Sequence, residues 1–230
     1  MQRTIITAVL VLFLSAPGWA QFEHPDLKGG KTVIKSAMIL PPNVKIVKSG
    51  VKGNEEMTEQ SRQIEAALPS LITSVLQEHQ CAVNDKVLAA DALEKDSDLK
   101  YAVADLQKRF DEMFPQLEKK PKDVRKGRFT MGDEVAKLNP GGAIDALVFV
   151  RGYGRVNTGG KVFLSAVAGA AAYNDSIYHI VVVDARSGAV LYYGVAAGAN
   201  PAKSPDSARK SIRKSFKDSP RELKGPADQA

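Results

Sequence analysis

The stretch that decides the fold is Val181–Gly194, which reads VVVDARSGAVLYYG. Two runs of β-branched, apolar and aromatic residues, which favour strands, flank a segment too short to form a helix. Gly188 can take the positive φ of a tight turn, and the Asp184 carboxylate can accept hydrogen bonds from the amides of that turn. Arg186 would then lie at the exposed tip. The segment therefore predicts an antiparallel hairpin in which all three residues have structural roles.

A catalytic role for Asp184 would require a nearby partner. The nearest histidine, His179, is five residues earlier on the same strand. Successive side chains of a strand alternate between its faces, so His179 is expected to point away from Asp184. The sequence therefore predicts a turn at this place and not a catalytic site.

Other apolar runs predict further strands. Ala37–Leu40 is a short one that ends at a pair of prolines, and another is expected to begin near Cys81. Ala143–Val150 is apolar in both alternations except at Asp145, which indicates a strand covered on both faces. We expect the glycine-rich stretch 151–160, RGYGRVNTGG, to end that strand.

Three helices are indicated by periodicity. The first is expected to be capped by Asn54, to carry Glu55 and Glu56 in its first turn, and to be kinked or split at Pro69. Asp98 is expected to open a second helix, whose apolar stripe from Leu99 to Leu117 packs on a sheet. A third, Ser204–Lys217, has a narrow apolar face and many basic residues, and a short helix is expected over Met131–Leu138.

The fold class predicted from these elements is α/β (α+β). It consists of a single mixed β-sheet flanked by helices, with a C-terminal antiparallel hairpin and a closing helix. We expect a signal peptide at 1–20, an exposed lead-in at 21–35, one α/β domain at 36–218 with a helical insert at about 89–138, and a polar tail at 219–230.

Export is indicated by the first twenty residues. Arg3 precedes the apolar run Ile5–Leu14, and small residues occupy the two positions that a signal peptidase reads before Gln21. The run is too short to span a bilayer, although an uncleaved membrane anchor is the alternative. No cysteine follows it, so no lipid-attachment site is predicted. Cys81 is the only cysteine, which excludes an internal disulfide, and it is expected to be a buried thiol.

Motifs for cofactors and catalysis fail at the residues that the chemistry needs. In the stretch PDLKGGKT, Pro25 occupies the first glycine position of a phosphate loop. In RVNTGGKV, Arg155 and Val162 occupy the positions of that glycine and of the magnesium-binding hydroxyl. Three isolated histidines and one cysteine give no metal-ligand spacing, and Ser165 lacks the context of a hydrolase nucleophile. The sequence predicts no cofactor and no enzyme activity.

The order of elements resembles that of a group of bacterial envelope domains. The stretches AMILPP, AIDALVFVRGYG and VVVDARSGAVLYY carry this resemblance, through Asp145 with Ala146–Val150 and through Asp184, Arg186, Gly188 and Leu191. The chain is similar in this respect to the curli-secretion-channel type, the penicillin-binding-protein-activator lipoproteins and the amino-terminal domain of the Tol translocation protein. The resemblance implies a non-enzymatic accessory or assembly factor that acts through protein contacts in the envelope.

Two regions are predicted to make these contacts. The first, the rim 151–161 with the small apolar run Val162–Ala172, contributes Arg151, Tyr153, Arg155, Lys161 and Phe163. The second is the basic C-terminal helix, with Arg209, Lys210, Arg213 and Lys214. Envelope proteins are the expected partners, and an anionic membrane surface is a further one for the basic helix. Nucleic acid is not expected.

Two other functions stay open. A periplasmic small-molecule or glycan binder would use residues 151–155 as the lip of a pocket. A membrane-inserting subunit would need Val162–Ala172 to form spanning strands.

Overall fold

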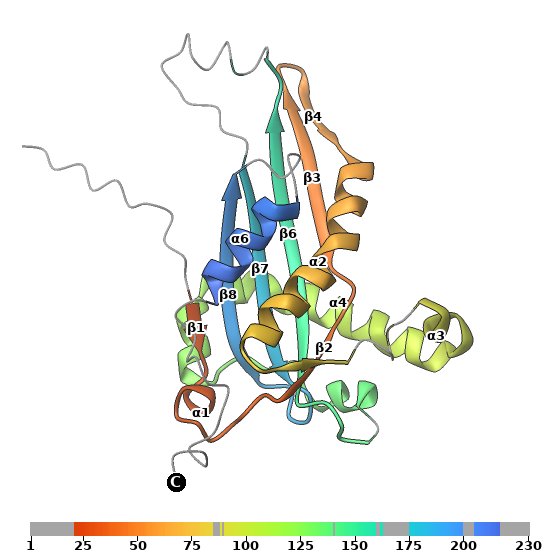
Figure 1. The fold of residues 1–230 in the computed structure, drawn as a ribbon, viewed down its shortest axis with the longest axis vertical. Helices are drawn as coiled ribbons and strands as arrows, with labels where there is room; N and C mark the ends of the chain where they lie inside the picture. Colours follow the sequence, from red (N-terminus) through yellow and green to blue (C-terminus); the bar gives the residue numbers. More distant parts are fainter. Residues whose placement is uncertain are drawn as a thin grey trace, which may run out of the picture.

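The computed structural model describes residues 21–84, 88, 90–139, 141–159, 162, 175–199 and 205–216. The described residues form an eight-stranded mixed sheet whose main path runs β1-β8-β7-β6-β2-β5 (Figure 1). Its strands are β1 (Gln21–Glu23), β2 (Ser36–Ile39), β3 (Asn43–Gly50), β4 (Gly53–Glu56), β5 (Ala82–Val83), β6 (Ala146–Asn157), β7 (Asp175–Asp184) and β8 (Val190–Ala199). With helices on both of its faces, the sheet confirms the predicted α/β class.

Strand β6 is the axis of the sheet. On one side it pairs antiparallel with β7, and on the other it runs parallel first to β2 and then to β3. Leu40, Pro41 and Pro42 separate β2 from β3, so the two strands lie end to end along β6. The strand predicted at 37–40 is present as β2. Only three residues separate its end from the start of β3.

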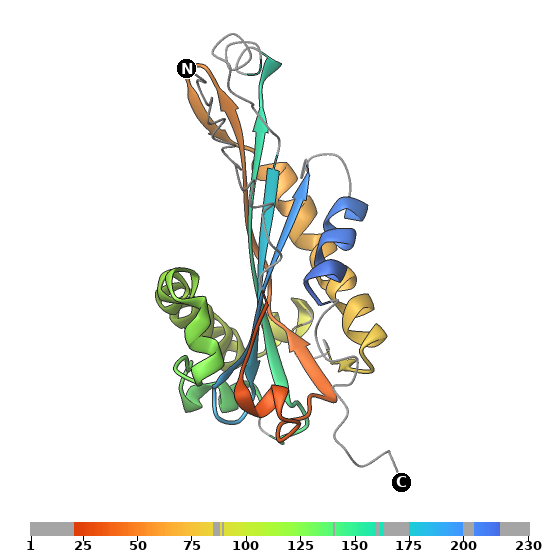
Figure 2. The ribbon, with the colours of Figure 1, turned by 90° about the vertical axis from the view of Figure 1, so that its left-hand side faces the viewer.

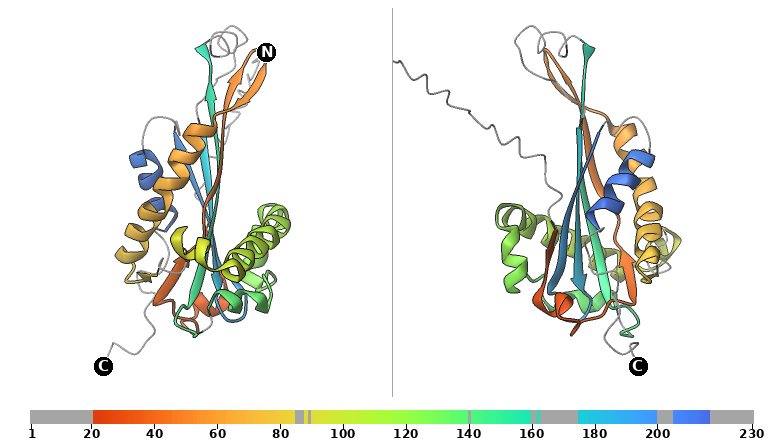
Figure 3. Two further views of the ribbon diagram at one scale, coloured as in Figure 1. Left: turned by 90° about the vertical axis from the view of Figure 1, so that its right-hand side faces the viewer. Right: turned by 60° about the vertical axis from the view of Figure 1, so that its left-hand side comes forward.

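Helices form a layer on each face. Helices α2 (Thr58–Glu78) and α6 (Pro205–Ser215) cover one face (Figure 2). Helix α4 (Ser97–Lys119) and the 3₁₀ helices η2 (Pro121–Lys126) and η3 (Asp133–Leu138) cover part of the other face (Figure 3). Two shorter helices are α1 (Pro25–Lys28) and α3 (Ala90–Lys95).

The core consists of two apolar clusters, one on each face of the sheet. Along β6, Ala146, Val148 and Val150 belong to the cluster under α2 and α6, whereas Leu147 and Phe149 belong to the cluster under α4. None of these five side chains is more than 3% exposed. The strand is therefore covered on both faces, as its continuous apolar run predicted.

The predicted start of α2 is wrong. Asn54, Glu55 and Glu56 belong to β4, which pairs antiparallel with β3, and the helix begins at Thr58. Asn54 could cap a helix, but it pairs instead with Ser49 of β3 across a tight hairpin. The helix also runs without interruption through Pro69, so the predicted split is absent.

Helix α2 also protects the edge of β3 that β4 leaves unpaired. The Val44 amide donates to the Glu65 carboxylate at 2.8 Å, and the Ile46 amide donates to Ser61 Oγ at 3.0 Å. Buried backbone donors need partners, and an open strand edge invites further pairing. Side chains of α2 therefore close this edge where no strand does.

The segment 21–35 differs from the exposed lead-in that was expected. Its first residues form β1, which pairs with β8 and places Phe22 opposite Tyr193. Phe22, Leu27 and Ile34 are all buried. Few apolar residues are present here, but these three belong to the core. The expected signal peptide, 1–20, and polar tail, 219–230, lie outside the described residues.

Smaller differences concern the ends of elements and one side chain. Asp96, and not Asp98, caps α4, since its carboxylate accepts a hydrogen bond from the Leu99 amide at 2.9 Å. The strand expected from Cys81 is reduced to the two residues of β5. The Cys81 thiol is buried as expected, and this burial raises its pKa to about 11. The thiol is therefore protonated and unreactive near neutral pH.

Candidate interaction surface

The β7–β8 hairpin uses its polar residues to hold the turn. Asp184 Oδ1 accepts hydrogen bonds from the amides of Arg186 and Ser187, at 3.0 and 2.7 Å, and from Ser187 Oγ at 2.8 Å. Gly188 has a φ of 71°, in the left-handed region that favours glycine. Asp184 Oδ1 therefore accepts three hydrogen bonds within the turn, and the role of this aspartate is structural.

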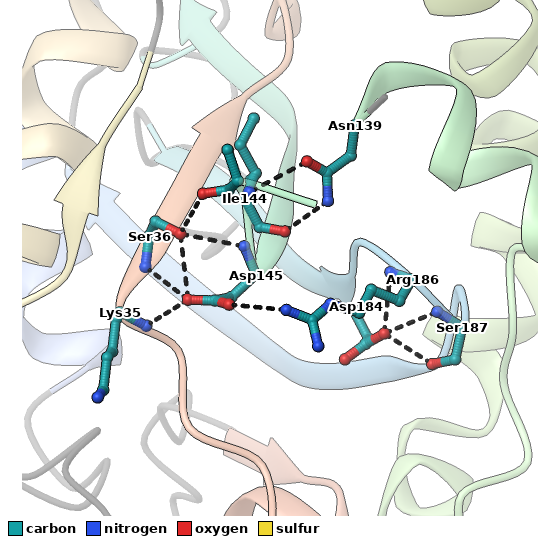
Figure 4. A network of polar contacts seen from close by, with 9 residues as sticks. Lys35, Ser36, Asn139, Ile144, Asp145, Asp184, Arg186 and Ser187 are labelled. Carbon is teal, nitrogen blue, oxygen red and sulfur yellow. Dashed lines mark hydrogen bonds and ion pairs between the residues drawn. The ribbon is translucent and has the colours of Figure 1, made fainter. Parts of the chain in front are cut away.

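Asp145 ties the start of β6 to the start of β2. Its Oδ2 accepts from the amides of Lys35 and Ser36, both at 3.0 Å, and from Ser36 Oγ at 3.1 Å (Figure 4). Its other oxygen lies 3.8 Å from the guanidinium of Arg186. The two aspartates matched by the envelope-domain resemblance thus both join strand ends, and neither is presented to a ligand.

The rim predicted at residues 151–161 is mostly strand. Pairing of β6 with β3 and β7 continues past Val150, and β6 ends only at Asn157. Gly152 does not break the strand: a Cβ at this position would lie 2.9 Å from Val44 Cγ2 and 3.1 Å from Tyr178 Cδ1. The glycine therefore permits close packing on the α2 face, and the prediction that 151–160 ends the strand is wrong.

The end of α4 lies over the row in which β6 Arg151 is paired with β7 His179. Arg151 Nη2 is 2.5 Å from Asp111 Oδ1, and its guanidinium carbon is 5.0 Å from the centre of the Phe114 ring. The His179 ring meets Phe114 edge-on at 4.9 Å, and its Nδ1 lies 2.8 Å from the Tyr193 hydroxyl. These contacts hold α4 against the sheet at this row of paired residues.

His179 should make stability depend on pH. Burial, and secondarily the charge of Arg151, lower its pKa from 6.5 to about 4 in the folded state. The unfolded chain therefore binds a proton first as the pH falls, so unfolding becomes easier between pH 6.5 and pH 4, by about 3 kcal/mol from this group. The substitution His179→Gln should remove this part of the pH dependence in urea unfolding followed by circular dichroism. The same slope in both proteins would contradict it.

Beyond that row, the sheet continues without α4 above it. We define the distal face as Lys45, Tyr153, Arg155, Asp175 and Ile177, which lie on the α4 side of β3, β6 and β7 beyond the row of Arg151. Tyr153 is paired with Lys45 on one side and Ile177 on the other, and it is 42% exposed. Figures 2 and 3 show that the described helices on this side cover the opposite end of the sheet.

Two ion pairs flank Tyr153 on this face. Arg155 and Asp175 make a forked contact, with Nε–Oδ1 at 3.2 Å and Nη2–Oδ2 at 3.3 Å. Lys45 Nζ lies 3.2 Å from Glu56 Oε2 of β4. Solvent-exposed pairs of this kind contribute less than about 1 kcal/mol to stability. They place charged side chains on both sides of the tyrosine.

The structure divides the predicted contact residues between two faces. Arg151, Tyr153 and Arg155 lie on the α4 side of β6. The four basic residues lie on α6, on the side of α2. Lys161 and Phe163 lie outside the described residues, as does most of the run at 162–172, of which Val162 is 43% exposed.

Lys45, Asp175 and Ile177 were not foreseen. Their place beside Tyr153 depends on the register of β6 against β3 and β7, and the pairing with β3 joins residues more than a hundred positions apart in the chain. The alternation of large residues with glycine in Arg151-Gly152-Tyr153-Gly154-Arg155 is the one local signal that could have indicated a strand here.

Neither a cluster of metal ligands nor a membrane-spanning helix is found among the described residues. Within the part of the chain that the structure describes, no three His, Cys, Asp or Glu side chains gather as metal ligands would. No helix built from those residues combines the length and the apolar character needed to cross a membrane.

Comparison with known proteins gives structural similarity alone. No family model and no curated protein matches the sequence. The lipoprotein GNA1162 from Neisseria meningitidis is 12% identical, with a TM-score of 0.34, and the match covers 71% of this chain and 81% of that one. A PelC dodecamer from Paraburkholderia phytofirmans is 13% identical, with a TM-score of 0.38 and coverage of 86% and 94%. A second PelC crystal structure gives 10% identity, a TM-score of 0.40 and the same coverage.

Proposed function

We propose that this protein is an exported accessory or assembly factor that binds a partner protein of the bacterial envelope through the distal face. The observation that carries the proposal is that β3, β6 and β7 extend beyond α4, so that Tyr153 stands accessible between two ion pairs. The role is one of contact and not of catalysis.

The composition of the distal face favours a protein partner. Tyrosine and arginine are enriched among the residues that contribute most to binding at protein interfaces, and charged pairs typically lie around such residues. Tyr153 lies on a strand paired on both sides, so its backbone is ordered before a partner binds, and its side chain has only two χ angles to fix. A rigid aromatic side chain with a charged border is suited to a specific, reversible contact.

The expected location and chemistry agree with this role. Arg3 and the apolar run Ile5–Leu14 have the pattern of a signal peptide, which would bring the chain to the periplasm. Asp145 and Asp184, the most extensively hydrogen-bonded carboxylates described above, are occupied with backbone amides. These observations support a binding function over an enzymatic one.

The alternative of a small-molecule or glycan binder has less support. It requires residues 151–155 to form the lip of a pocket, whereas they form a strand that is paired on both sides. A membrane-inserting role rests on the run at 162–172, most of which lies outside the described residues.

Affinity purification of the tagged protein from its native host tests the proposal. The unsubstituted protein should recover one or two specific envelope proteins, and Tyr153→Asp should lose them because a carboxylate replaces the exposed ring. Tyr101→Asp is the matched control, since Tyr101 is 71% exposed on α4, away from the distal face. Mass spectrometry identifies what is recovered. Recovery of the same proteins by all three would place the contact elsewhere, and recovery of none would exclude the role.

A further inference from the structure

Strand β8 is longer than the strand that pairs with its outer edge. It runs from Val190 to Ala199, whereas β1 pairs with it only at Tyr192, Tyr193 and Gly194. Figure 1 shows β1 beside the lower part of β8. Among the described residues, no strand pairs with this edge beyond Gly194. The segment 195–199 therefore extends past the pairing with β1.

Alternate residues of this segment turn their backbone groups towards the outer edge. The Leu191 carbonyl, on the same edge, accepts a hydrogen bond from the His24 amide at 2.8 Å. In an antiparallel sheet the residues of a strand point their amides and carbonyls alternately to the two neighbouring strands. Tyr193 and Ala197 therefore face the β1 side, whereas Ala196 faces β7. Beyond β1, the outward groups are a template for one more strand.

The segment has none of the features that usually protect a sheet edge. Residues 195–199 read VAAGA, with no charge and no proline. Other edges of the described sheet are short or protected. Strand β1 has three residues and β5 has two, β4 carries Glu55 and Glu56, and side chains of α2 close the edge of β3. The end of β8 is therefore the edge best suited to accept another strand.

We infer that the partner adds an extended segment to β8 at residues 195–199, an inference that rests on the proposed function. Ala197 is paired with Ile177, which is paired with Tyr153, so an added strand would continue a row of the distal face. Residues directly opposite in neighbouring strands carry their side chains on the same face. Because Ala197 has only a methyl group, a large apolar side chain opposite it can reach Ile177. Main-chain hydrogen bonds then supply affinity, and this side chain supplies specificity.

The segment that occupies this edge comes from another protein and not from this chain. Strand β1 runs antiparallel to β8 and begins at Gln21, opposite Gly194, so only residues before Gln21 could continue its line. The predicted signal peptide ends at residue 20, and its removal leaves the exported chain no residue for this place. Two copies paired through 195–199 alone would bury far less than the roughly 1,000 Å² of a stable interface. An envelope partner, in contrast, also contacts Tyr153.

Hydrogen exchange of the exported protein, purified from its native host, tests whether the edge is open. The Ala197 amide should exchange at least about 100-fold faster than the Ala196 amide, which belongs to the ladder with β7. Nuclear magnetic resonance resolves the two amides. Equal protection of both would overturn the inference, because the edge would then already be covered.

Affinity purification from the native host tests the pairing itself. Ala197→Pro removes the outward amide, and proline is tolerated where the donor of an edge strand faces solvent. It should lower recovery of the envelope partner at least about tenfold, because a carbonyl of the added strand loses its donor. Ala197→Gly is the matched control, since it changes the same residue but keeps the amide, and it should retain the partner.

The outcomes separate this inference from the proposed function. Full recovery with Ala197→Pro, together with loss on Tyr153→Asp, would overturn the inference alone. Loss on Ala197→Pro with full recovery on Tyr153→Asp would overturn the distal face instead, and recovery of no partner by the unsubstituted protein would overturn both. A dimer of this chain that Ala197→Pro abolishes would replace the partner segment by a second copy. Circular dichroism confirms that each variant folds, and hydrogen exchange decides if Ala197→Pro does not.

Discussion

Gly188→Ala is expected to lower the free energy of unfolding by about 3–5 kcal/mol, a loss that only a few mechanisms produce. A Cβ at Gly188 would lie 2.1 Å from the carbonyl oxygen of Gly132, which is backbone and has no rotamer to change. The hairpin would have to move away from the loop before η3. Moving it would break the hydrogen bonds from the Met131 amide to the Gly188 carbonyl and from the Val190 amide to the Phe129 carbonyl.

Gly142→Ala separates this steric effect from the cost of the backbone conformation. Gly142 has a φ of +64°, close to the +71° of Gly188, and nothing lies within 4 Å of a Cβ placed there. Its substitution should cost only the strain of a left-handed alanine, about 1–2 kcal/mol. Urea unfolding of both variants measures the difference. Equal losses would show that the hairpin does not pack on Gly132 as described.

Phe110→Ala is expected to cost about 3–5 kcal/mol, as truncation of a buried aromatic residue does. Phe110 is 2% exposed, and its ring stacks on Phe149 of β6 at 4.8 Å and meets Phe114 at 5.6 Å. The cavity would open at the centre of the cluster that joins α4 to the sheet. This substitution tests whether the insert predicted at 89–138 is an integral layer of the fold.

Tyr101→Ala is the control on the same helix. Tyr101 is exposed on the outer side of α4, so its loss should change stability by no more than about 0.5 kcal/mol. Thermal melts followed by circular dichroism compare the two variants. A small effect from Phe110→Ala would mean that α4 is a separate appendage on a sheet that is stable without it.

The elements foreseen from the sequence are those whose signal is local. The hairpin at Asp184–Gly188 needs only its turn residues, and the strand at 146–150 needs only an unbroken apolar run. The stripe of α4 is a periodic pattern over about five turns, and its buried residues are Val103, Leu106, Phe110, Phe114 and Leu117. In each case the residues that determine the element lie close together in the sequence.

The elements that were missed depend on distant partners. Asn54, Glu55 and Glu56 have the composition of a helix start, but β3 pairs with them first. Gly152 looks like a strand breaker until Val44 and Tyr178 are seen to fill the space of its missing side chain. The three-residue strand β1 forms because it can pair antiparallel with β8.

The candidate surface was foreseen in part for the same reason. Tyr153 and Arg155 were identified, but as part of a glycine-rich rim and not as one side of a strand. Lys45, Asp175 and Ile177 become their neighbours only through the register of three strands. Composition indicates which side chains suit a contact, whereas topology determines which of them share a face.

Photocrosslinking in living cells tests the central claim most directly. A benzophenone amino acid replaces Tyr153 in one variant and Tyr101 in another, and both are irradiated in the native host. The distal face account predicts a discrete crosslinked product from position 153, containing a second envelope protein, and none from position 101. The same products from both positions, or none from position 153 in a protein that is exported and folded, would contradict it.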